Sequence, residues 1–210
     1  MPDPGRAGRA EEARVARAVR RVKWLTPRGW AAALAVGLAT IYGFGWRGLA
    51  ALLAFFVSSS LLSTKHTSRN ARQVVANGGI AALAALAGNW VWFAGALATA
   101  NADTWATEIG SRSPTLPRLV TTGARVPPGT DGGMTLLGTA GGIAGAGFLA
   151  GLSLLLVGRG ALTIAAAGVL GMLLDSLLGA TVQGKVRWMD NDAVNLAATL
   201  AGAVCAGLLA

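Results

Sequence analysis

The chain has 210 residues, of which 53% are hydrophobic and 13% are charged, and its formal net charge is +9. Because a water-soluble domain carries about 25% charged residues, this composition excludes a soluble protein and indicates an integral membrane protein. The single cysteine, Cys205, excludes a disulfide framework within the chain.

Residues 1–28 form a basic arm, and residues 29–210 are expected to form one transmembrane domain. No aromatic residue is interleaved with the cations of the arm between Arg6 and Lys23, which argues against nucleic acid as a partner and favours anionic membrane lipids. Residues 10–24 have helical spacing and predict a short amphipathic helix on the cytoplasmic membrane surface. We interpret the arm as a retained signal anchor of a multi-pass cell-membrane protein, with its N-terminus in the cytoplasm.

Apolar runs over 30–44 and 49–62 predict the first two membrane spans. Residues 80–106 are apolar except for Gly88-Asn89, which fits either one tilted span or a hairpin of two short helices. The segments on both sides of this run are basic and should both be cytoplasmic, so we expect the hairpin. Further spans follow at 134–157, 162–182 and 191–210. The fold class is therefore an all-α polytopic membrane bundle of about seven spans, or six if 80–106 crosses once.

Three polar residues, Arg69, Gln73 and Asn77, are spaced i, i+4 and i+8. A helix through this segment would place all three on one face, where they could contact a substrate. The alternative is a solvated helix in a loop.

The other unusual polar residues are expected to converge at the cytoplasmic ends of the later spans. These residues are Asn101, Asp103, Thr104, Thr107, Glu108, Asp175, Ser176, Gln183, Asp190, Asn191, Asp192 and Asn195. In the sixth span Gly168, Gly171, Asp175 and Gly179 share one face, so another helix or a ligand could approach Asp175 closely.

Four carboxylates, Asp103, Glu108, Asp175 and Asp192, are the candidate catalytic residues. Hard oxygen ligands suit Mg²⁺, which bridges to phosphate groups. Asp103 and Glu108 lie about 140° apart on a helix, so we do not expect them to bind one ion together. Asp103 and Asp175 are the predicted metal ligands, with Glu108 and Asp192 as further ligands or orienting groups. The alternative is hydrogen bonding between helices.

A glycine-rich turn, Gly129-Thr130-Asp131-Gly132-Gly133, precedes the span at 134–157. Backbone N–H groups in such a turn can cradle the phosphates of a nucleotide. Arg125, just upstream, could add a charge-assisted contact. A plain proline-glycine turn explains the segment equally well.

Four motifs in order resemble the membrane family that includes plant phytyl-phosphate kinase and its bacterial and animal relatives. They are NADTWATEIG (101–110), PRLVTTGARVPPGTDGG (117–133), GMLLDSLLGATVQ (171–183) and WMDNDAVN (188–195), and RNARQVVANGG (69–79) also matches. The resemblance covers roughly residues 30–210. It implies transfer of the γ-phosphoryl group of CTP or another NTP to an isoprenoid monophosphate such as phytyl phosphate. The pattern of Asp103, Ala106 and Gly110 is also similar to membrane polyprenol kinases and cytidylyltransferases that use CTP.

Together these features predict an Mg²⁺-dependent phosphotransferase whose active face is cytoplasmic. The expected substrate-binding residues are Arg69, Gln73, Asn77, Thr107, Ser176, Gln183, Asn191 and Asn195. Two alternatives stay open, a CTP-dependent lipid-phosphate cytidylyltransferase and a non-enzymatic transporter that uses the intramembrane Asp175. The outer halves of the spans are almost purely apolar, which disfavours transport.

Overall fold

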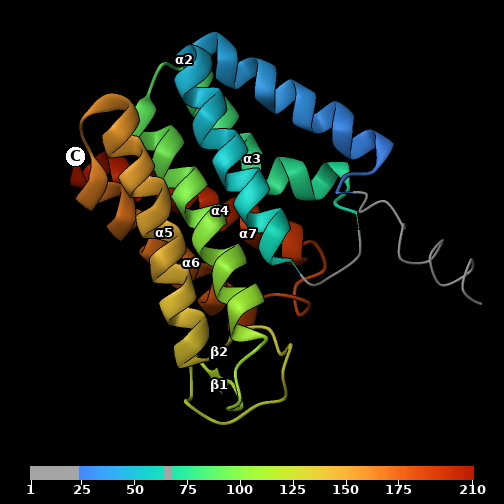
Figure 1. Ribbon diagram of the computed structural model, residues 1–210. Helices are drawn as coiled ribbons and strands as arrows, with labels where there is room; N and C mark the ends of the chain where they lie inside the picture. Colours follow the sequence, from blue (N-terminus) through green and yellow to red (C-terminus); the bar gives the residue numbers. More distant parts are fainter. Residues whose placement is uncertain (1–23, 64–67) are drawn as a thin grey trace, which may run out of the picture.

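The computed structural model describes residues 24–63 and 68–210 (Figure 1). The amphipathic helix predicted over 10–24 lies, apart from Trp24, outside the described residues. The described elements are α2 (Pro27–Leu62), α3 (Ala71–Leu86), α4 (Trp90–Gly110), β1 (Arg118–Leu119), β2 (Gly133–Met134), α5 (Leu136–Val157), α6 (Ala161–Thr181) and α7 (Asn191–Leu209). The helices pack side by side as a bundle, which confirms the predicted fold class.

The count of seven spans is not matched. Six helices are seen in the described ranges, and four of these, α2, α5, α6 and α7, are long and apolar enough to cross a membrane. The first two predicted spans are the two halves of α2, which bends at Gly45, where the backbone is non-helical (φ 59°, ψ −142°). Only glycine adopts this conformation readily. Figure 1 shows the two halves of α2 running in different directions from this bend.

The hairpin predicted at Gly88-Asn89 is confirmed, because α3 ends at Leu86 and α4 begins at Trp90. The Asn89 side chain caps α4 by accepting a hydrogen bond from the N–H of Trp92. However, α3 already begins at Ala71, nine residues before the apolar run. The polar segment and the first arm of the hairpin are therefore one helix.

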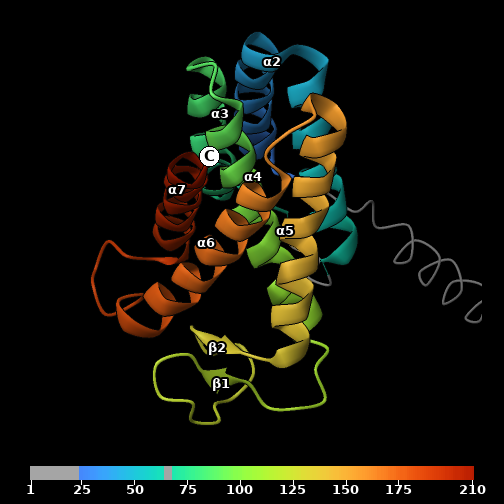
Figure 2. The same ribbon diagram turned by 90° about the vertical axis from the view of Figure 1, so that its left-hand side faces the viewer.

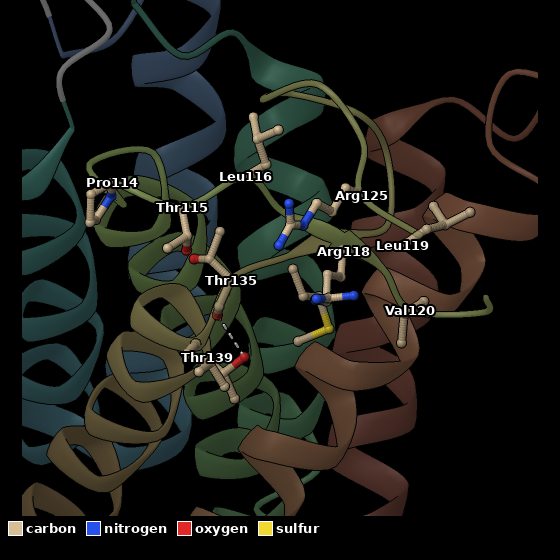
Figure 3. A pocket seen from close by; sticks show the side chains of 11 residues that line it. Pro114, Thr115, Leu116, Arg118, Leu119, Val120, Arg125, Thr135 and Thr139 are labelled. Carbon is tan, nitrogen blue, oxygen red and sulfur yellow. Dashed lines mark hydrogen bonds between the residues drawn. The ribbon is translucent and has the colours of Figure 1, made fainter. Parts of the chain in front are cut away.

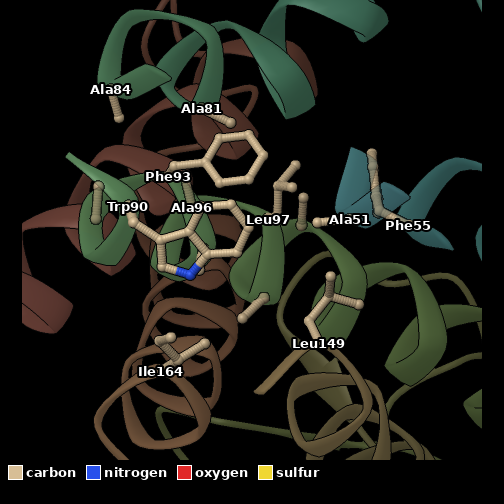
Figure 4. Packing of buried hydrophobic residues seen from close by; sticks show 14 of the residues in the cluster. Ala51, Phe55, Ala81, Ala84, Trp90, Phe93, Ala96, Leu97, Leu149 and Ile164 are labelled. Carbon is tan, nitrogen blue, oxygen red and sulfur yellow. The ribbon is translucent and has the colours of Figure 1, made fainter. Parts of the chain in front are cut away.

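Helix α4 is the centre of the bundle and packs against each of the other described helices. Its side chains Phe93 and Leu97 are fully buried in the main apolar cluster, and Trp90 packs beside them (Figure 4). Most other members of the cluster are alanines, which let the helix backbones approach closely, as is common in membrane bundles.

A short antiparallel ribbon joins β1 to β2 in the connection between α4 and α5. Arg118 pairs with Met134 and Leu119 pairs with Gly133. The C-terminal ends of α4 and α6 both point toward this ribbon (Figure 2). The ribbon, which was not predicted, is thus placed next to the polar ends of these two helices.

Candidate functional site

Asp103 of α4 and Asp175 of α6 face each other, with their carboxyl groups close enough to interact. The Oδ2 atom of Asp175 is buried and has no hydrogen-bond partner among the described residues. Two carboxylates in contact repel each other unless a proton or a cation lies between them. This pair is the part of the described chain best suited to hold a cation.

The small-residue face of α6 produces the contact between the two carboxyl groups. A Cβ at Gly168 would clash with Ala98, and one at Gly171 would clash with Thr99. Helices α4 and α6 therefore run together at close range, and the next turn brings Asp175 to Asp103. The shared face predicted for Gly168, Gly171, Asp175 and Gly179 is confirmed, and it lies against α4 and the connection that follows α4.

The glycine-rich turn packs on the C-terminal half of α6. A Cβ at Gly132 would lie 2.5 Å from the Cβ of Ala180 and 2.6 Å from the carbonyl oxygen of Ser176. This docking brings Asp131 close enough for its charge to act on Asp175. The backbone carbonyl of Ser176, a predicted substrate-binding residue, lies beneath the turn.

The turn uses part of the backbone that was expected to cradle phosphate. The N–H of Thr130 donates to the carbonyl of Pro127, and the N–H of Gly133 donates to the carbonyl of Thr130. Thr135 caps the N-terminus of α5, because its hydroxyl accepts a hydrogen bond from the N–H of Gly138. The N–H groups of Thr130 and Gly133 are therefore used within the turn, and the predicted phosphate cradle is left with the other N–H groups of the turn.

Glu108 lies away from the aspartate pair, as its helical phase predicts. It is buried, and the hydroxyl of Ser63 donates to its Oε1 at 3.0 Å. Burial lowers the pKa of the Arg69 guanidinium, and the negative charge of Glu108 partly offsets that shift. Glu108 thus belongs to a contact between α2, α4 and the segment before α3. Its expected role as a further ligand of the same ion is not supported by this position.

Asp192 also lies apart from the pair, because it shares Arg72 with Asp190. The Arg72 Nη2 atom is 2.6 Å from Asp190 Oδ2, and its Nε is 3.6 Å from Asp192 Oδ2. The exposed Asp190 caps α7, and the hydrogen bond from the N–H of Ala193, followed by that from Arg72, holds its pKa below the usual range. The sequence prediction overlooked Arg72 as the matching cation.

The predicted face of Arg69, Gln73 and Asn77 is wrong at its first member. Arg69 precedes α3, and its backbone bonds to Trp24 and Thr26 instead. Gln73 accepts from the N–H of Asn70 at 2.9 Å in a capping box. The Asn77 amide donates to the carbonyl of Gln73 at 2.9 Å. The spacing of Gln73 and Asn77 on α3 reflects local hydrogen bonding at the start of the helix.

The other expected substrate-binding residues lie at helix ends. Thr107 and Asn191 are exposed, whereas Gln183 and Asn195 are half-buried. Asn101 is fully buried, and its amide donates to the carbonyl of Gly145 at 2.8 Å. It also accepts from the hydroxyl groups of α2, so its role is to join α2, α4 and α5.

Across the described ranges, no three His, Cys, Asp or Glu side chains assemble into a ready-made metal site. Mg²⁺ does not need such a cage, because it usually takes one or two carboxylates together with waters and substrate phosphates. Asp103 and Asp175 provide that number of ligands, and Asp131 approaches from the turn.

A pocket of about 630 Å³ lies between the connection that follows α4 and the start of α5 (Figure 3). Arg118 and Arg125 line it together with the hydroxyl-bearing Thr115, Thr135 and Thr139. Arg125 was predicted to meet phosphate, whereas Arg118, Thr135 and Thr139 were missed. Arg118 could have been included on the sequence alone, because it lies in the same basic segment as Arg125.

Comparison with known proteins gives a family and several relatives. Residues 13–203 match the family described as integral membrane protein DUF92. An uncharacterized membrane protein of Methanocaldococcus jannaschii is 34% identical over 211 residues, which cover 91% of this chain and 88% of the relative. An uncharacterized membrane protein of Synechocystis sp. is 31% identical over 216 residues, which cover 88% of this chain and 82% of the relative. The chloroplastic protein VTE6 of Arabidopsis thaliana is 28% identical over 222 residues, which cover 90% of this chain and 66% of the relative. No solved structure matches the chain significantly.

Proposed function

The chain belongs to the DUF92 family of integral membrane proteins, and from this premise we propose that it is a membrane phosphotransferase. It transfers the γ-phosphoryl group of CTP or another NTP to an isoprenoid monophosphate, such as phytyl phosphate, and gives the diphosphate. The observation that carries the proposal is the contact between Asp103 and Asp175, next to a connection that carries two arginines into a pocket. The resemblance of the same segments to the phytyl-phosphate kinase family supports it.

The residues present fit Mg²⁺. The buried, unpartnered Oδ2 of Asp175 and the adjoining carboxyl of Asp103 are hard oxygen donors, and their mutual repulsion favours a bound cation. When bound, Mg²⁺ would neutralise negative charge on the transferred phosphoryl group. Asp103 and Asp175 would hold it from two helices that pack tightly together, which keeps their positions fixed.

The reaction asks little covalent chemistry of the protein. An oxygen of the acceptor phosphate attacks the γ-phosphorus of the nucleotide, and the bond from that phosphorus to the β–γ bridging oxygen breaks. The products are the isoprenoid diphosphate and the nucleoside diphosphate. A phosphate monoester is largely dianionic at neutral pH, with a second pKa of about 6, so the acceptor needs no general base. Positioning and charge neutralisation carry the catalysis, which fits a site of carboxylates and arginines.

The proposed site faces the cytoplasm. Lys185, Arg187 and the arginines of the 111–135 connection lie at this end of the bundle, and positive charges favour the cytoplasmic side. A nucleotide would meet the metal site from that compartment, while the isoprenoid chain stays in the bilayer.

The test is turnover by purified protein in detergent with Mg²⁺, labelled CTP or ATP, and a panel of prenyl monophosphates. We expect a prenyl diphosphate and a nucleoside diphosphate in equal amounts. A CDP-lipid with pyrophosphate would establish the cytidylyltransferase instead. If no nucleotide is consumed with any acceptor, the phosphotransferase proposal is refuted.

A further inference from the structure

Arg118 and Arg125 are held side by side by the backbone. They form an antiparallel bridge, and Arg118 also pairs with Met134 of β2. Side chains directly opposite in such a pair lie about 5 Å apart at their Cβ atoms, and like charges there are destabilising. Neither guanidinium is in a salt bridge with a described carboxylate, and the described residues that line the pocket include no acid. An anion in the pocket would relieve this repulsion.

The arginines are available for such an anion. Arg118 uses one donor, from Nη1 to the carbonyl of Gly123 at 2.9 Å, which fixes its side chain and leaves the other guanidinium donors of the fork. Figure 3 shows both side chains over the pocket, with Thr115 and Thr135 beside it. Two guanidinium groups with neighbouring hydroxyls suit the several oxygens of a phosphate group.

The rest of the pocket is apolar and leads to the lipid-facing side of α5. Its lining includes Leu116, Leu119 and Leu136, and among the described residues that line it there is no aromatic ring on which a nucleobase could stack. Leu136 is 90% exposed, and Ile143, two turns later on the same face of α5, is 53% exposed. A ligand with a phosphate head and an apolar tail would fit this sequence of surfaces better than a nucleotide.

The pocket adjoins the carboxylate pair through one side chain. Met134 lines the pocket and also packs against the buried cluster of Ala102, Ala146 and Met172. Ala102 precedes Asp103, and Met172 lies three residues before Asp175. Met134 thus links the pocket to the segments of α4 and α6 that carry the predicted metal ligands.

We propose that this pocket is the binding site for the isoprenoid monophosphate, with Arg118 and Arg125 holding its phosphate and the face of α5 at Leu136 and Ile143 holding the start of its tail. The identification of the ligand as the acceptor rests on the proposed phosphotransferase function. The binding of a phosphate-bearing lipid rests on the pocket alone.

Binding of phytyl monophosphate to the full chain in detergent, without nucleotide, tests the proposal. We expect Arg118→Gln with Arg125→Gln to weaken binding at least about tenfold, because charge-assisted hydrogen bonds are lost. The matched control is Arg47→Gln with Arg159→Gln, which removes two arginines from a pocket lined by the α3–α4 and α5–α6 turns. This control should leave binding unchanged. Phytol, which lacks the phosphate, should bind much more weakly than phytyl monophosphate.

The single variant Arg125→Gln distinguishes a loss of binding from a loss of folding, because it leaves the hydrogen bond from Arg118 to Gly123 in place. It should weaken binding while the unfolding transition is retained, and Arg125→Lys should recover part of the affinity. Equal affinity of the double variant and the wild type would overturn the proposal. So would a loss of CTP binding with phytyl monophosphate binding intact. Arginine-dependent binding in a protein that consumes no nucleotide would support the pocket and refute the phosphotransferase.

Discussion

The substitution Gly132→Ala is expected to separate the glycine-rich turn from α6. Its Cβ would lie 2.5 Å from the Cβ of Ala180 and 2.6 Å from the carbonyl oxygen of Ser176, whereas atoms in contact normally lie about 3.5–4.0 Å apart. The turn must therefore move by roughly 1 Å or more, and overpacking of this kind costs about 1–3 kcal/mol. The φ of +73° at Gly132 adds about 1–2 kcal/mol for a residue with a side chain.

Gly129→Ala is the matched control for this substitution. Gly129 also has a positive φ, +86°, but a Cβ added there would meet no atom within 4 Å. Gly129→Ala should lower the free energy of unfolding only by the cost of a positive φ for alanine, about 1–2 kcal/mol. Unfolding of both variants in one detergent, followed by circular dichroism, gives the difference in the free energy of unfolding. We expect Gly132→Ala to be the less stable by about 1–3 kcal/mol. Equal losses would refute the docking of the turn on α6 as an energetic contact.

Three further predictions concern side chains that the structure places in different roles. Asp103→Asn and Asp175→Asn should each lower Mg²⁺-dependent turnover at least about 100-fold with the unfolding transition retained; a loss of folding in both would favour a purely structural pair. Asn101→Leu should lower the free energy of unfolding by about 1–2 kcal/mol, because it leaves buried partners in α2 and α5 unpaired, and an unchanged denaturation midpoint would contradict this. Asp190→Asn should destabilise the protein at neutral pH. The folded pKa of Asp190 is lowered by its cap and by Arg72, so its contribution is present above the unfolded value of about 3.9 and is lost as pH falls through the folded pKa. The difference from wild type should therefore shrink in acid, and a pH-independent difference would argue against a contribution from the negative charge of Asp190.

Much of the fold could be predicted because hydropathy and charge are local signals. The hairpin between α3 and α4 followed from the break at Gly88-Asn89 and from basic segments on both sides. The bend in α2 was misjudged, since the sequence around Gly45 looks like a break between two spans. The ribbon of β1 and β2 was missed because its strands have two residues each and pair across a long connection. Strands this short carry no readable alternation.

The parts of the site that depend on the phase of a single helix could be predicted. The parts that depend on how helices distant in sequence pack together could not. Asp103 and Asp175 each lie on a face that can be worked out from 100° per residue, and the structure brings the two faces together. The pairing of Arg72 with Asp190 depends on how α3 sits against α7 across 118 positions of sequence. The phase of one helix does not determine how two helices align, so Asp192 was grouped with the other carboxylates and not with Arg72.

Like charges gather in two places at this end of the bundle, carboxylates beside α6 and guanidinium groups in the connection between α4 and α5. Asp103 and Asp131 each repel Asp175 beside α6, and Arg118 and Arg125 repel each other at the pocket. Each group costs free energy by itself, and each is matched by one component of the proposed reaction, the cation and the phosphate. Because the bound cation and the bound phosphate would also attract each other, binding of either should strengthen binding of the other by the same factor. A site for phosphoryl transfer requires this coupling, whereas an interhelical contact that serves only folding does not.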